Sequence, residues 1–97
     1  MSMDSGNFYD PILADLIPTY IAIQKQTIAQ LTEALIGSDF QTIQDLAHRI
    51  KGSAACYGFK PYGDLAARLE EVSKQKEIQT CRDIFALMRK EFPQGFA

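Results

Sequence analysis

Apolar residues recur at helical spacing along most of this 97-residue chain, and the pattern predicts four amphipathic helices. The expected helices cover residues 19–36, 39–57, 61–74 and 78–92. Asp10 followed by Pro11 is typical of a helix start and predicts a short extra helix to about residue 16. We expect Pro18 to separate this helix from the next one with a break near Ile17.

Glycine, proline and small polar residues mark the connections between these segments. We expect Gly37 just past the end of the first long helix, where a left-handed residue is favoured. Ser38 and Gln41 are expected to form a capping box at the start of the second. Gly58 is expected to end that helix, and Pro61 to open the third. Short links make consecutive helices antiparallel, so the predicted fold is all-α: an antiparallel up-down-up-down four-helix bundle with a short extra N-terminal helix.

Length and composition indicate one globular domain, with 46% hydrophobic and 23% charged residues. We expect residues 1–9 to form a flexible N-terminal tail and residues 10–97 a single bundle domain. The first residues lack the basic-then-apolar order of a signal peptide, and no apolar run approaches the roughly 20 residues that span a bilayer. We therefore expect a cytoplasmic protein, and we expect it to be a monomer. A net charge of −2 without a basic cluster argues against a nucleic-acid partner.

The chain contains a single histidine, His48, in the second expected long helix. The apolar stripe of this helix spans a sector of about 80°, and His48 projects roughly 140° away from its centre. The stripe consists of Ile43, Leu46, Ala47, Ile50, Ala54 and Tyr57. We therefore expect an exposed imidazole. The residues that share its outer face are Gln44, Lys51, Gly52 and Ala55.

Glycine inside a helix costs about 1 kcal/mol relative to alanine, so Gly52 needs a local reason. A bare surface beside His48 lets another protein approach the ring closely. Lys51 supplies a positive charge where an anion on the ring would lie. This combination favours a histidine that is phosphorylated on its outer nitrogen and passes the phosphoryl group on.

The segment 47–54, AHRIKGSA, followed by Gly58-Phe59, closely resembles the histidine phosphotransfer (HPt) domains of bacterial multistep phosphorelays. The pair Leu69-Glu70 is similar to the second landmark of that family, and the resemblance covers roughly residues 10–92. It implies a phosphocarrier of two-component signalling. His48 would accept a phosphoryl group from a receiver-domain aspartate or a hybrid kinase and pass it to the receiver aspartate of a response regulator.

The resemblance also implies the partners, which are response-regulator receiver domains and a sensor or hybrid histidine kinase. The chain has no glycine-rich phosphate loop and no nucleotide motif, so we expect a phosphoryl carrier without its own ATP site rather than an enzyme. We expect no metal or cofactor on this chain, because the family uses the Mg²⁺ of the partner receiver domain. Lys51 would offset part of the phosphoryl charge, and Gln44, Gly52 and Ala55 would serve docking and access.

Glu70 has two interpretations. Residues 48 and 70 are about equally far from the expected turn near residue 59, so they should stand at similar heights on antiparallel helices. In the chemotaxis-kinase branch of the family, an acidic residue at the matching position bonds the inner ring nitrogen, which suggests that Glu70 orients His48. Alternatively, Glu70 is a solvated residue that pairs with Lys74 four positions later. The sequence leaves both open.

Two other functions are compatible with the same pattern. A non-phosphorylated four-helix adaptor would bind receiver or kinase domains without accepting phosphate, although His48 and Lys51 are both retained. A histidine-dependent phosphatase would need a convergent acid–base set, which the sequence does not reveal.

Overall fold

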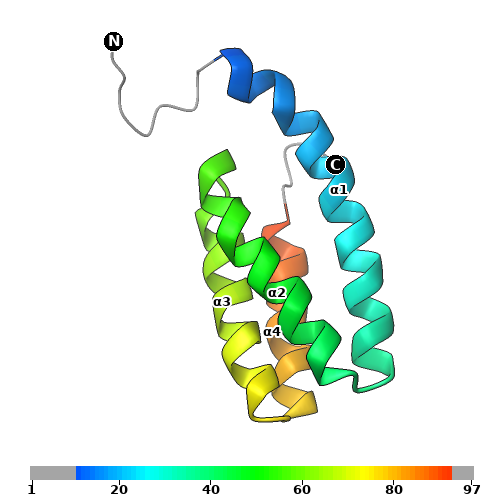
Figure 1. Cartoon of the computed structure of the whole chain (residues 1–97). Helices are drawn as coiled ribbons and strands as arrows, with labels where there is room; N and C mark the ends of the chain where they lie inside the picture. Colours follow the sequence, from blue (N-terminus) through cyan, green and yellow to red (C-terminus); the bar gives the residue numbers. More distant parts are fainter. Residues whose placement is uncertain (1–10, 93–97) are drawn as a thin grey trace.

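The computed structural model describes residues 11–92, with side chains from residue 15 onward, and this part of the chain is helical with no β-strand. Its helices are α1 (Pro11–Ile36), α2 (Phe40–Ala54), α3 (Lys60–Lys74) and α4 (Ile78–Glu91), with a short 3₁₀-helix η1 (Ala55–Tyr57) after α2. The predicted all-α, four-helix class is confirmed. The chain reverses direction at each connection between the α-helices (Figure 1). The expected N-terminal tail and Asp10 lie outside the described residues.

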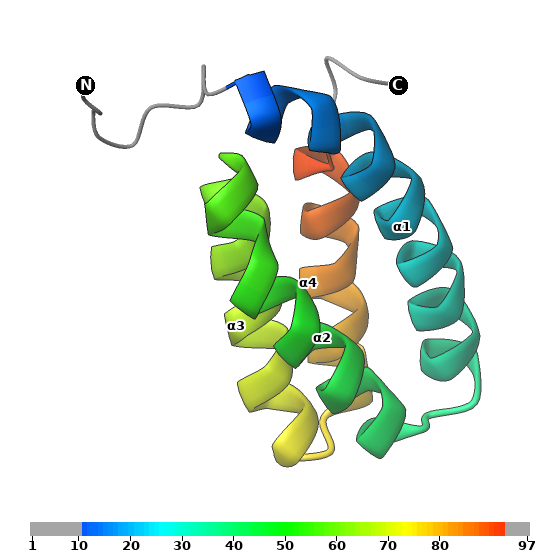
Figure 2. The same ribbon diagram turned by 45° about the horizontal axis from the view of Figure 1, so that its top comes forward.

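The prediction of a separate N-terminal helix is wrong, because α1 runs through Pro18 without a break. Proline inside a helix costs about 3 kcal/mol. Pro18 lies on the exposed side of α1, and Tyr20 and Ile21 just beyond it are buried. Burying two large side chains contributes about 1.5–3 kcal/mol each, which outweighs the lost backbone bond. The first turns of α1 lean over the end of the bundle (Figure 2).

Ser38, and not Gly37, adopts the left-handed conformation after α1, with φ of 51°. The amide of Asp39 donates to the carbonyl of Ala34 at 2.8 Å, and the amide of Ser38 donates to Leu35 at 3.3 Å. This pair of bonds is the Schellman arrangement, shifted one residue beyond the predicted glycine. Gly37 directly follows α1, as predicted, but the expectation that it is the left-handed residue is wrong.

The N-cap of α2 is Asp39. Its carboxylate accepts hydrogen bonds from the backbone amide of Thr42 at 3.2 Å and from the Thr42 hydroxyl at 2.7 Å, and these bonds lower the pKa of Asp39. The predicted capping box is wrong, because Ser38 closes α1 and cannot also cap α2. The Gln41 amide donates instead to Asp45 at 2.9 Å.

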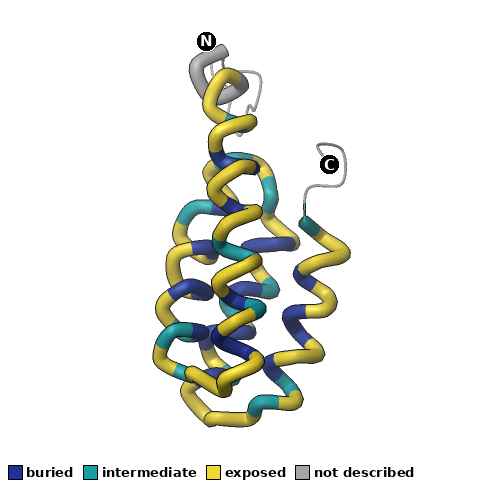
Figure 3. Tube along the Cα trace, turned by 90° about the vertical axis from the view of Figure 1, so that its right-hand side faces the viewer, coloured by how far each residue is buried: buried dark blue, intermediate teal, exposed yellow. Residues whose placement is uncertain are grey.

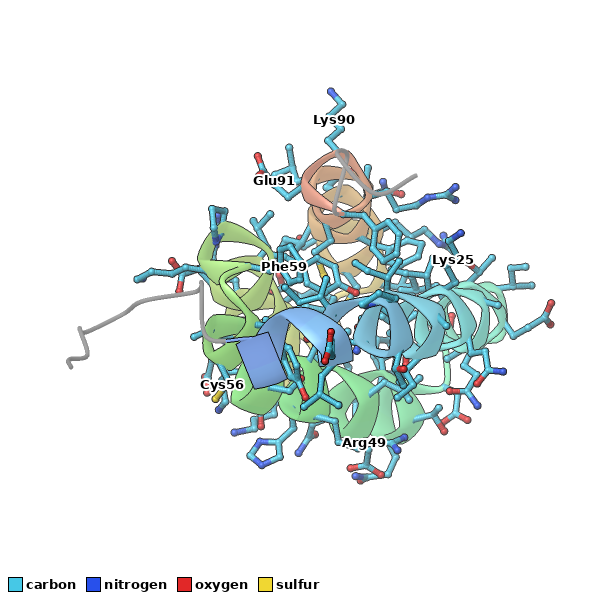
Figure 4. The ribbon with its side chains drawn as sticks, turned by 90° about the horizontal axis from the view of Figure 1, so that it is seen from above. Lys25, Arg49, Cys56, Phe59, Lys90 and Glu91 are labelled. Carbon is cyan, nitrogen blue, oxygen red and sulfur yellow. The ribbon has the colours of Figure 1, made fainter. Side chains whose placement is uncertain are left out.

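The second predicted helix ends in the tighter turn η1, which Gly58 closes with φ of 87°. Tyr57, which was expected in the buried stripe, is only half-buried because the 3₁₀ turn changes its direction. Its ring stacks on Tyr20 of α1, with centroids 4.2 Å apart. Phe59 follows and lies between the helices, whereas Cys56 lies on the outer side (Figure 4).

The buried positions line the inner side of each helix (Figure 3). In α2 they are Ile43, Leu46, Ala47, Ile50 and Ala54, as the apolar stripe predicts. One polar residue of α1, Gln24, is only 4% exposed. Its side-chain oxygen accepts a hydrogen bond of 2.8 Å from the Tyr62 hydroxyl, which satisfies it inside the bundle. No helix within residues 11–92 is both long and apolar enough to cross a membrane.

The close approach of α2 and α3 depends on Gly63. A Cβ atom at this position would lie 2.9 Å from the Cβ of Ala54, which is closer than side chains normally come. Two small residues thus bring the two helices together. This close approach sets the distance over which a side chain of α3 can contact side chains of α2.

Candidate functional site

His48 projects from the outer face of α2, as the helical spacing predicts, and its side chain is 65% exposed. The inner face of the same helix is packed into the bundle, so the backbone that carries the ring is held rigidly. An exposed ring on a fixed backbone is accessible to another protein.

Glu70 on α3 bridges two side chains of α2. One carboxylate oxygen, Oε2, lies 2.9 Å from Nδ1 of His48, and the other, Oε1, lies 2.7 Å from Nζ of Lys51. Glu70 itself is only 7% exposed. The interpretation of Glu70 as a solvated partner of Lys74 is wrong, because Lys74 lies 3.4 Å from Glu71 instead.

The bridge determines which nitrogen of His48 carries the proton. The hydrogen bond from Lys51 holds the pKa of Glu70 below its usual value; burial opposes this shift, and the bond with His48 adds to it. The carboxylate is therefore ionised at neutral pH and can only accept hydrogen bonds. Nδ1 must then be the donor, which leaves the lone pair on Nε2.

The surface around the ring is open on one side and shallowly hollowed on the other. Gly52, one turn beyond His48, would carry a Cβ with nothing within 4 Å of it. Ala55 is exposed at the start of η1. The depression beside the ring is lined by Gln44, Asp45, His48, Arg49 and Glu70. Gln44 is half-buried in it, and Arg49 lies on the outer side of α2 (Figure 4).

The family model of the Hpt domain matches residues 15–94 of this chain, a span that includes all the residues of the site. The chain belongs to the Hpt domain family. Comparisons with curated proteins and with solved structures gave no match. Membership implies phosphotransfer in two-component signalling, and Hpt domains act as phosphocarriers rather than catalysts.

The ion pair between Lys51 and Glu70 of this Hpt domain was not predicted from the sequence. The sequence indicates that Lys51 shares the outer face with His48, but its ammonium group reaches around α2 to the carboxylate on α3. The spacing within a single helix does not reveal this pair. The pair can be foreseen only once the position of Glu70 on α3, between the side chains of His48 and Lys51, is known.

The acidic and thiol side chains of the described residues do not form a metal site. Within this part of the Hpt domain, no three His, Cys, Asp or Glu residues lie together in a group that could hold an ion. Beside the oriented imidazole, the surface presents the buried Glu70 carboxylate, the Lys51 ammonium group and the charged side chains of Asp45 and Arg49.

Proposed function

We propose that this Hpt domain accepts a phosphoryl group on Nε2 of His48 from a receiver-domain aspartate or a hybrid kinase, and delivers it to the receiver aspartate of a response regulator. The observation that carries this proposal is the 2.9 Å bond between Nδ1 and Glu70. It directs the free lone pair outward on a side chain that is 65% exposed.

The proposed transfer step forms one bond to phosphorus and breaks one, and it uses no cofactor on this chain. The Nε2 lone pair attacks phosphorus, the bond from phosphorus to the aspartyl oxygen breaks, and its electron pair leaves with the carboxylate. The product ring is a cation that still bears its Nδ1 proton, and the ionised Glu70 faces this proton. In the return step, a receiver carboxylate attacks phosphorus and the electrons of the P–N bond go back to Nε2.

The partner supplies the remaining parts of the reaction. In-line phosphoryl transfer requires positive groups around the equatorial oxygens, and we assign that role to the Mg²⁺ that the acidic pocket of the receiver domain would hold. Gly52 and Ala55 give the partner room to approach, and Gln44 contributes to the contact surface. We expect the protein to act as a monomer in the cytoplasm.

The first prediction tests His48 directly. Incubation with a phosphorylated receiver or its hybrid kinase is expected to give an acid-labile, alkali-stable label on the wild-type protein. The label should be absent from His48→Gln, since the amide provides no nucleophilic ring nitrogen. The Glu71→Gln variant, which changes an exposed residue paired with Lys74, should be labelled normally.

Two outcomes contradict the proposal. An unchanged label on His48→Gln places the phosphoryl group elsewhere. Receiver binding of equal affinity in both proteins, without any label, identifies a non-phosphorylated adaptor.

A further inference from the structure

In the proposed phosphorylated state, the Glu70 carboxylate interacts with two positively charged groups, the Lys51 ammonium and the protonated ring of His48. Nζ of Lys51 lies 2.7 Å from Oε1, and Nδ1 of His48, which carries the ring proton, lies 2.9 Å from Oε2. We propose that Lys51 sets the lifetime of the phosphohistidine by weakening the hold of Glu70 on this ring proton. The inference rests on the proposed function and adds a regulatory role for Lys51 within the same site.

The ring proton controls how readily the P–N bond breaks. When water attacks phosphorus, the electron pair of that bond goes to Nε2. If Nδ1 is protonated, the leaving group is a neutral imidazole; if it is not, the leaving group is an imidazolate, which leaves far more slowly. A carboxylate that stabilises the protonated ring therefore shortens the life of the phosphoryl group, both for hydrolysis and for transfer.

Lys51 opposes this effect of Glu70. An ammonium group on one oxygen withdraws negative charge from the other oxygen, so the carboxylate stabilises the ring cation less. The Glu70 side chain is only 10% exposed, so solvent screens the three charges weakly. Lys51 is 42% exposed and can be replaced with little effect on packing.

Few other charges face the ring. The depression around it contains Asp45 and Arg49 from α2 and Glu70 from α3, and its lining includes no residue of α1 or α4. Asp45 accepts a hydrogen bond from the Gln41 side chain. Among these described residues, Glu70 is the one that bonds to both His48 and Lys51. A substitution of Lys51 can therefore act on the ring proton through the Glu70 carboxylate.

The test measures loss of phosphate from the protein after phosphorylation with phosphoramidate, followed by ³¹P NMR across a pH series. Hydrolysis is fast while the ring is protonated and slows as pH rises. In Lys51→Met, the midpoint of this decline should move up by about half a pH unit, which makes loss above the midpoint about two- to threefold faster. Glu70→Gln should move the midpoint down.

The double variant separates an effect through Glu70 from a direct effect of Lys51 on the phosphoryl group. In the Glu70→Gln background, Lys51→Met should change neither the midpoint nor the rate appreciably, because the carboxylate through which it acts is gone. Lys74→Met is the matched control: Lys74 lies one turn from Glu70 but pairs with Glu71. It should behave as wild type.

The outcomes distinguish the two proposals. A threefold effect of Lys51→Met that persists unchanged without Glu70, or slower loss in Lys51→Met, overturns the role of Lys51 while leaving His48 as the acceptor. Failure of wild type to take up phosphate at His48, from phosphoramidate or from a receiver, overturns both. Circular dichroism of each variant shows whether the bundle remains folded.

Discussion

Two helical glycines lie on opposite sides of α2: Gly63 of α3 packs against its inner face, and Gly52 lies on its outer face. The two differ in what surrounds them. On the inner side, a Cβ on Gly63 of α3 would lie 2.9 Å from the Cβ of Ala54. On the outer side, a Cβ on Gly52 would meet nothing within 4 Å. Each glycine costs its helix about 1 kcal/mol relative to alanine. Only Gly63 is needed for packing among the described residues, which supports the proposed role of Gly52 in giving a partner access to His48.

The largest effect is expected on the inner face. Replacing Gly63 with leucine should lower the free energy of unfolding by about 3 kcal/mol, because the new side chain would force α2 and α3 apart at Ala54. Urea denaturation followed by circular dichroism measures the loss.

A compensating pair sharpens this prediction. Gly63→Ala alone should destabilise the protein by about 1 kcal/mol or more, and adding Ala54→Gly should remove the collision between the two Cβ atoms. If the double variant is destabilised by as much as the sum of the two single variants, the two positions do not limit the approach of the helices.

A smaller effect is expected where the two faces meet, at Glu70. At pH 7, Glu70→Gln should lower the free energy of unfolding by about 2 kcal/mol, since charged hydrogen bonds to His48 and Lys51 are lost. The folded-state pKa of Glu70 is lowered. Its contribution is therefore fully present above the ordinary value of about 4.3 and is lost as pH falls through the lower folded value.

Denaturation curves at pH 7, 5, 4 and 3 test this dependence. The advantage of the wild type over Glu70→Gln should shrink as pH falls from about 5 towards 3, because the Glu70 carboxylate is then protonated. Glu71→Gln is the matched comparison, because the Glu71 side chain is 69% exposed and its pair with Lys74 is 3.4 Å long. It should change stability by less than about 0.5 kcal/mol at every pH. Equal effects of the two substitutions would show that the burial of Glu70 contributes nothing.

The smallest effect on stability is expected on the outer face. Gly52→Ala should raise the free energy of unfolding by up to about 1 kcal/mol, because alanine favours the helix and its methyl group has space. Gly52→Gln should also fold normally. Its side chain should nevertheless slow phosphoryl transfer from a receiver about tenfold, or about 1.4 kcal/mol, by obstructing the partner near His48.

Phosphorylation by phosphoramidate provides the control for this variant. The small donor needs no docking surface, so Gly52→Gln should accept its phosphoryl group at the wild-type rate. Slow transfer together with reduced helicity would instead assign Gly52 a packing role and remove the contrast with Gly63.

The helices themselves were largely predictable, because apolar periodicity reports which side of a helix can be buried. The α2 stripe from Ile43 to Ala54 is buried as expected. The errors occur where local propensity and packing disagree. Pro18 was expected to end a helix, but the burial of Tyr20 and Ile21 carries α1 through it. Gly37 was expected in the left-handed position, and Ser38 occupies it one residue later.

Gln24 illustrates a second limit. Its polarity predicts an exposed position, yet it is buried because the Tyr62 hydroxyl of α3, 38 residues away, donates a hydrogen bond to it. A pairing over this distance leaves no trace in the periodicity of either helix. Burial of a polar side chain depends on a partner that only the folded chain provides.

The sequence by itself determined the number and approximate extent of the four long helices, and that His48 faces outward from one of them, because both follow from the 3.6-residue repeat within a single segment. Only the tertiary structure decided between the two interpretations of Glu70. The height and separation of α2 and α3, set by the contact of Gly63 with Ala54, bring its carboxylate to Nδ1 of His48 and Nζ of Lys51. Hydrogen bonds require distances of about 3 Å, and distances of that kind between helices are fixed by packing rather than by spacing along the chain.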